Sequence, residues 1–104
     1  MKSILYALLL FASGSAFADG WTADFNISNI YVAGQNNFQY RIYGMQSIAS
    51  CTNGSNWAYI NDSDGGAAGY YSTLLMAYAA GKPVRFNIVT VNGYCHIIEL
   101  FVSG

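Results

Sequence analysis

The stretch Tyr70–Val89, YYSTLLMAYAAGKPVRFNIV, decides the fold. Its first half carries no charged residue, and Gly81 followed by Pro83 is typical of a helix end, because glycine readily takes the left-handed conformation and proline cannot continue a helix. Its second half alternates apolar with other residues, which is the period of a strand. We therefore predict a helix from about Tyr70 to Ala80 and a strand from Val84 to Val91.

Further strands are predicted on both sides of this stretch. The runs Phe25–Val32 and Phe38–Gly44 alternate and are separated by a turn rich in glycine and asparagine, which predicts a hairpin. The first run changes register near Asn29, which indicates a bulge. Two more strands are predicted, a short one at Trp57–Ile60 and the last at His96–Val102.

The predicted order is three strands, a helix and two strands. This β-β-β-α-β-β order is that of the five-stranded OB barrel. We therefore expect a mainly β fold with one helix, as an OB-like barrel in a single domain covering residues 19–104. A chain of this length has a core near the lower limit for independent stability.

The chain begins with a predicted signal peptide, residues 1–18. Lys2 supplies the positive charge, the apolar run Ile4–Phe11 is too short to span a membrane comfortably, and Ala16–Ala18 is a small-x-small cleavage site. We expect cleavage after Ala18 and a secreted or periplasmic mature protein. In an oxidising compartment, the two cysteines, Cys51 and Cys95, predict one disulfide.

Charge and motifs exclude several classes of function. The mature chain has three basic and five acidic residues and no basic cluster, so we expect no nucleic-acid partner. The single histidine, His96, lacks a catalytic motif around it, so we expect no enzyme, no cofactor and no metal. The run Asp62-x-Asp64-Gly65 resembles the start of a calcium loop but lacks the later acidic ligand, so we expect a plain loop.

The helix is uncharged on every side. A helical projection places Tyr70, Leu74 and Tyr78 on an arc that can cap the barrel. The opposite arc is small and mostly apolar, and a helix that is apolar nearly all round is usually buried on both sides. We predict that this arc packs against another subunit, whereas the alternative is an exposed alanine-rich face. The predicted interface residues are Ser72, Thr73, Met76, Ala77 and Ala80.

Several segments, taken in order, resemble the B subunits of subtilase cytotoxin and pertussis-like five-B-subunit toxins. The resemblance covers roughly residues 21–88. The segments are Trp21-Thr22, Phe38–Gly44, Ser47–Cys51, Asn53–Trp57, Ser72–Leu74 and Gly81–Arg85. Arg41 stands where that family has a cysteine in the second strand, and the family's C-terminal extension is missing.

The resemblance implies an OB fold that forms a homo-oligomer, a pentameric ring whose helices line the centre. It also implies binding of sialylated or related glycans and a catalytic A subunit as partner. The family's glycan site uses a serine near the start of the first strand. With the aromatic, hydroxyl-rich surface, this makes Asp24, Asn26, Ser28 and Tyr43 the candidate glycan-binding residues.

Three functions therefore stand against one another. The first is a non-enzymatic glycan-binding module of a bacterial AB-type toxin. The second is a secreted or periplasmic structural or protein-interaction domain without a toxin partner. The third is a small secreted inhibitor that uses the loop at residues 61–69.

Overall fold

The chain folds into a sheet with one helix against it. The computed structural model describes residues 20–48, 50–54 and 56–104, so the predicted signal peptide lies outside the described residues. The mainly β fold with one helix and the predicted order of the main elements are confirmed, with one short strand added before them. The elements are β1 Gly20–Trp21, β2 Asn29–Val32, β3 Tyr40–Tyr43, β4 Trp57–Ile60, α2 Ala67–Ala80, β5 Val84–Val91 and β6 Tyr94–Val102.

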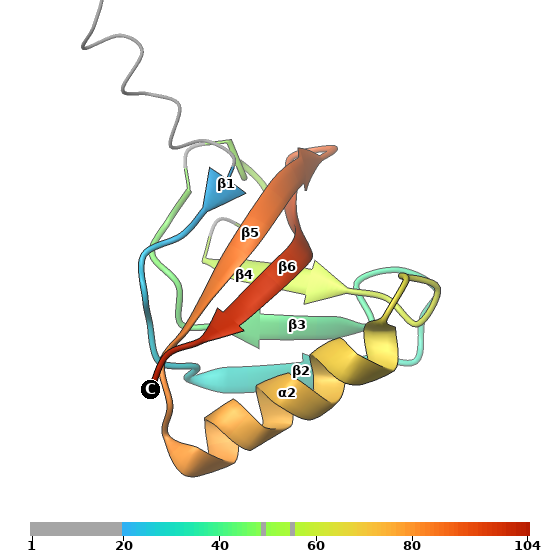
Figure 1. Cartoon of the computed structure of the whole chain (residues 1–104). Coiled ribbons are helices and arrows are strands. Elements are labelled where there is room, and N and C mark those ends of the chain that lie inside the picture. Colours follow the sequence, from blue (N-terminus) through green and yellow to red (C-terminus); the bar gives the residue numbers. More distant parts are fainter. Residues whose placement is uncertain (1–19, 49, 55) are drawn as a thin grey trace, which may run out of the picture.

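The six strands form one sheet in the order β1-β5-β6-β4-β3-β2. All neighbours are antiparallel except β4 and β6, which are parallel and are joined by a connection that contains α2 and β5. The sheet is not closed into a barrel, so the predicted five-stranded barrel is not confirmed. α2 lies along one end of the sheet (Figure 1).

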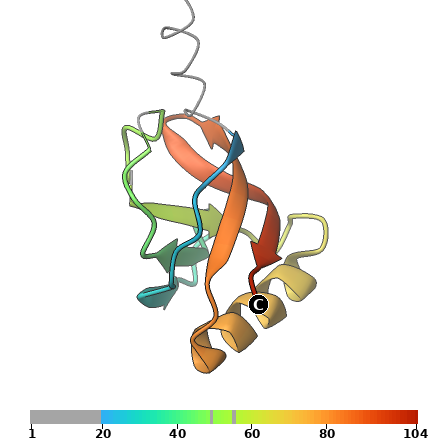
Figure 2. The same ribbon diagram turned by 60° about the vertical axis from the view of Figure 1, so that its left-hand side comes forward.

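One N-terminal segment supplies both edges of this sheet. β1 pairs with β5, and Phe25 then bridges to Val84 on the same strand, before β2 pairs with β3 at the opposite edge. Figure 2 shows the segment running down alongside β5. The register shift that we predicted as a bulge near Asn29 therefore marks a change of partner strand between Phe25 and β2.

The core lies on one face of the sheet. Its largest fully buried side chains come from β3, β4, β5, β6 and α2, and the disulfide between Cys51 and Cys95 closes it with a Cα–Cα distance of 5.5 Å. The predicted disulfide is thus confirmed, and it fits a secreted or periplasmic location. Besides the two cysteines, the largest fully buried side chains are Ile42, Ile60, Leu74, Val84, Phe86, Ile88 and Ile97.

Two glycines bound the helix. Gly66 precedes it and Gly81 follows it, both in the left-handed conformation. At the C-terminus, Lys82 N–H donates to the carbonyl of Ala77 and Gly81 N–H to that of Tyr78, which is the Schellman arrangement. The predicted stop is therefore confirmed, whereas the helix begins three residues earlier than predicted, because its first turn includes part of the glycine-rich stretch expected to be loop.

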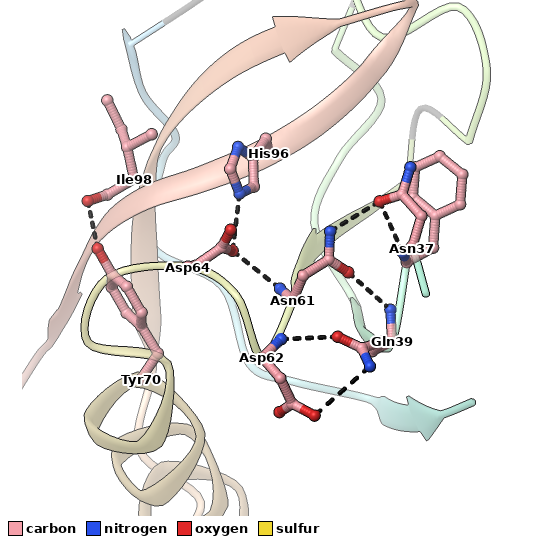
Figure 3. A network of polar contacts seen from close by, with 9 residues as sticks. Asn37, Gln39, Asn61, Asp62, Asp64, Tyr70, His96 and Ile98 are labelled. Carbon is pink, nitrogen blue, oxygen red and sulfur yellow. Dashed lines mark hydrogen bonds and ion pairs between the residues drawn. The ribbon is translucent and has the colours of Figure 1, made fainter. Parts of the chain in front are cut away.

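A bulge in β6 explains two adjacent isoleucines. The pairing with β5 shifts between Asn87, opposite Glu99, and Ile88, opposite Ile97, so that Ile98 is the extra residue. The Ile98 carbonyl accepts a hydrogen bond from the Tyr70 hydroxyl, which ties α2 to β6 (Figure 3).

Candidate functional site

A pocket of about 590 Å³ lies between the N-terminal segment and the chain that leaves β3. Its lining mixes an exposed indole with carboxylate, amide and hydroxyl groups. The lining residues are Trp21, Thr22, Ala23, Asp24, Phe25, Gly44, Met45, Gln46, Ser47 and Ile48.

Gly44 allows the two walls of this pocket to meet. Its φ is +125°, and a Cβ there would lie 2.4 Å from the Asn26 carbonyl oxygen and 3.0 Å from the Ser28 nitrogen. Only glycine adopts this conformation without strain. Met45 follows as a buried anchor, 4% exposed, so the next residues are held against the N-terminal segment.

Charged and aromatic groups gather at the rim around Asp24. One oxygen of its carboxylate accepts a hydrogen bond from the Ser103 hydroxyl at 3.0 Å, and the other lies 4.0 Å from Nε of Arg85. The Arg85 guanidinium lies between two exposed rings, 5.4 Å from the centroid of Trp21 and 4.6 Å from that of Phe101. Arg85 Nε is buried and has no hydrogen-bond partner among the described residues.

The structure brings some of the predicted glycan-binding residues together. Asp24 lines the pocket, and Asn26 and Ser28 adjoin it through backbone atoms next to Gly44. Tyr43 does not join them, because its ring lies near Trp57 on the opposite surface of the sheet, with a centroid distance of 6.2 Å.

Sequence reasoning missed the second wall of the pocket. Gln46 and Ser47 lie in a segment without strand or helix, so no hydrophobic period marks them. The available sequence signal was Trp21, a tryptophan three residues before Asp24, and the structure leaves it 47% exposed.

The helix presents an uncharged face that differs from the predicted one. Leu74 and Ala77 are fully buried, whereas Leu75, Met76 and Tyr78 are 42%, 51% and 46% exposed. Ala77 therefore belongs to the chain's own core and leaves the predicted interface. We define the exposed helix face as Ser72, Leu75, Met76, Tyr78, Ala79 and Ala80.

Thr73, the remaining predicted interface residue, is only partly exposed at the margin of this face. It lines a second, smaller hollow with Gly65, Gly66, Gly69, Tyr70 and Leu100.

His96 is paired with Asp64, a contact that the sequence did not reveal. Its Nε2 lies 2.8 Å from an Asp64 carboxylate oxygen that also accepts the Asn61 backbone N–H (Figure 3). The His96 ring stacks on that of Tyr59, with a centroid distance of 4.7 Å. Burial, and secondarily the Asp64 charge, raise the pKa of Tyr59. The Asp64–His96 pair joins the loop after β4 to β6.

The acidic loop is held by protein groups. Asp62 accepts hydrogen bonds from the Tyr40 hydroxyl at 2.6 Å and from the Gln39 side chain. Within residues 20–48, 50–54 and 56–104, no group of three histidine, cysteine, aspartate or glutamate side chains could hold a metal ion.

Comparison with known proteins adds no relative. No protein-family model matches the chain, and no curated protein matches it either. In the part of the chain that the structure describes, no helix is long and apolar enough to cross a membrane.

Proposed function

We propose that this chain is a secreted, non-enzymatic module that binds a glycan in the pocket beside Trp21 and Asp24. The pocket carries the proposal, since it combines an exposed aromatic ring with fixed polar groups in a volume suited to a small ligand. The resemblance to toxin B subunits supports the same ligand class.

The chemistry of a sugar suits this lining. The apolar C–H face of a sugar ring can stack on the indole of Trp21, which is accessible. Its hydroxyl groups can donate to the Asp24 carboxylate and exchange hydrogen bonds with the Gln46 amide. Recognition through hydroxyl groups requires no large charge, in keeping with the low charge of the chain.

The test is glycan binding by the mature, oxidised protein, first on a broad array and then by calorimetry. We expect Trp21→Ala and Asp24→Asn each to weaken binding at least tenfold, which corresponds to about 1.4 kcal/mol. Val91→Ala and Glu99→Gln remove an exposed apolar group and an exposed charge elsewhere, and they should leave binding unchanged. The proposal would be refuted if no glycan on the array bound, or if the control variants lost as much affinity as the pocket variants.

We also propose that the module forms a ring of identical subunits through the exposed helix face, with a catalytic A subunit as its further partner. The support is that α2 carries no charge while Leu75, Met76 and Tyr78 remain exposed. The N-terminal segment reaches both edges of the sheet, which supports an OB-like architecture for each subunit.

The second candidate is a secreted or periplasmic interaction domain with no toxin partner. The same helix face favours it, because an apolar face can equally cover a different protein. A monomeric protein that repeatedly captures one partner from the native secretome, and loses it on Met76→Glu, would favour this candidate over the ring.

A further inference from the structure

The outward surface of β2, β3, β4 and β6 carries aromatic side chains where a solvated sheet face normally carries polar ones. We call this surface the aromatic face; it faces away from the core, because the neighbouring residues Ile42, Ala58, Ile60 and Cys95 are buried on the other side. It is formed by Tyr31, Arg41, Tyr43, Trp57, Tyr59 and Tyr94.

The rings form a continuous platform. Trp57 lies 5.5 Å from Tyr94 and 6.4 Å from Tyr59, measured between ring centroids. Tyr31 is 49% exposed at the edge, whereas Tyr59 is only 4% exposed, with Phe38 and His96 packed on its ring. Four neighbouring strands at about 4.8 Å spacing make the platform about 14 Å wide. Such a width suits a chain of several planar or ring-shaped units better than one small molecule.

Arg41 gives this platform a positive charge in a chain whose acidic residues outnumber its basic ones. Its guanidinium lies 4.7 Å from the ring centroid of Tyr31 and 5.3 Å from that of Trp57, and its Nε donates to the Phe38 carbonyl at 3.1 Å. Among the described residues it forms no ion pair with a carboxylate. Asp64, whose charge acts on Tyr59 of this face, is paired with His96 instead.

Phe38 is held over the platform in a strained conformation. Its φ is +57°, which is an outlier for a bulky residue, and its ring contacts Tyr59 at 4.7 Å and Tyr94 at 4.4 Å. The Asn37 side chain accepts the Phe38 N–H and also a hydrogen bond from the Asn61 amide (Figure 3). Strained residues fixed in this way are concentrated at binding sites and clamps.

Gln39 extends the attachment of this loop. Its backbone N–H donates to the Asn61 side chain at 3.1 Å, and its own amide oxygen accepts the Asp62 N–H at 2.6 Å (Figure 3). The rim of the platform is therefore rigid and rich in amide groups before any ligand arrives, which lowers the entropy cost of binding.

We propose that the aromatic face is a second binding surface, distinct from the pocket, for a linear carboxylated polysaccharide. Sugar rings stack on Trp57 and Tyr94, a sugar carboxylate pairs with Arg41, and the amide rim meets hydroxyl groups. A neutral saccharide leaves Arg41 without its counter-charge, and a nucleic acid would need more than one cation along its phosphates.

The first test compares a galacturonate decasaccharide with its methyl ester, by calorimetry on the mature, oxidised protein. We expect the acid form to bind and esterification to weaken binding about tenfold or more, since it removes the partner of Arg41. Arg41→Gln should cause a similar loss and should abolish the difference between the two forms. Equal binding of acid and ester by the unmodified protein would overturn the proposal.

A second set of variants separates this surface from the pocket and from other ligands. Tyr31→Ala, at an exposed edge position, should weaken binding several-fold, whereas Asp24→Asn in the pocket should leave it unchanged. Loss of galacturonate binding on Asp24→Asn would refute the proposal, and so would tighter binding of oligodeoxythymidylate than of galacturonate. A lower native mass of Tyr31→Ala would also refute it, because the aromatic face would then be a contact between subunits. The pocket variants Trp21→Ala and Asp24→Asn test the pocket separately, so failure at one surface does not decide the other.

Discussion

At the scale of single residues, the pocket depends on the backbone of Gly44. Any side chain there would contact the Asn26 carbonyl and would have to take a φ of +125°. We expect Gly44→Ala to lower the free energy of unfolding by about 2 kcal/mol or more, measured by urea denaturation. Gly34→Ala is the matched control, since nothing lies within 4 Å of a Cβ there, and it should change stability by less than about 0.5 kcal/mol. Equal losses of stability in the two variants would show that the backbone at Gly44 does not require a glycine.

Tyr59 makes stability depend on alkaline pH. Burial, and then the charge of Asp64, raise its pKa in the folded state, so folding favours the neutral phenol. This contribution is complete below the unfolded pKa of about 10 and is lost as the pH rises through the higher folded value. We expect Tyr59→Phe to reduce the loss of stability above about pH 10, measured by urea denaturation across that range. A Tyr59→Phe protein with the same alkaline profile as the unmodified protein would contradict this.

The sequence predicted individual residues only where the residue type or its local position indicates its role. The two cysteines were predicted to pair because thiols in an oxidising compartment form disulfides, and the structure confirms the pair. Asp24 was proposed as a glycan-binding residue, and the structure places it in the lining of the pocket. His96 and Asp64 lie far apart in the chain and meet only because β4 and β6 are parallel neighbours. Tyr43 was assigned to the wrong neighbours because the two faces of β3 look equally aromatic in sequence.

At the scale of elements, alternation located the strands well. β4 and β5 begin and end where the pattern predicted, because each alternates between a buried and a more exposed face or is bounded by turn residues. The facing of α2 was harder, since apolar residues surround it and no amphipathic stripe separates its two sides. Sheet closure could not be read from element order, because it depends on pairing between distant segments.

The facing of the helix can be tested with adjacent leucines. Leu74 is fully buried and Leu75 is 42% exposed, so the same truncation removes very different contacts. We expect Leu74→Ala to lower the free energy of unfolding of the monomer by about 2–5 kcal/mol, and Leu75→Ala by less than about 1 kcal/mol, both measured by urea denaturation. Similar losses at both positions would contradict the observed facing.

The disulfide links the loop before β4 to the start of β6. It joins residues 44 apart in sequence, and closing a loop of that size stabilises by about 4 kcal/mol on the chain-entropy model. We expect the double variant Cys51→Ala, Cys95→Ala to lose about 2–5 kcal/mol in urea denaturation. A reductant should lower the stability of the unmodified protein by a similar amount and leave the variant unchanged. If the reductant changed the stability of neither protein, the disulfide would not be stabilising the fold.

At the scale of the whole molecule, different surfaces suit different ligands. The pocket is concave and mixed, the aromatic face is broad and carries Arg41, and the exposed helix face is apolar and uncharged. Pockets suit small ligands, whereas extended apolar faces on small proteins mark contacts with other macromolecules. A small chain can therefore bind ligand on the sheet and still assemble through its helix.

Self-association through the helix is the prediction on which the ring depends. We expect the mature, oxidised protein to show a native mass several times that of one chain by light scattering, five times for the proposed pentamer. Met76→Glu, at a position 51% exposed, should reduce the mass to one chain without lowering the stability of the fold, because a carboxylate in an apolar interface loses its hydration. Val91→Glu, also at an exposed apolar position but in β5, should keep the assembly intact. An unmodified protein that is monomeric at every concentration would eliminate the ring and leave the exposed helix face to a different protein partner.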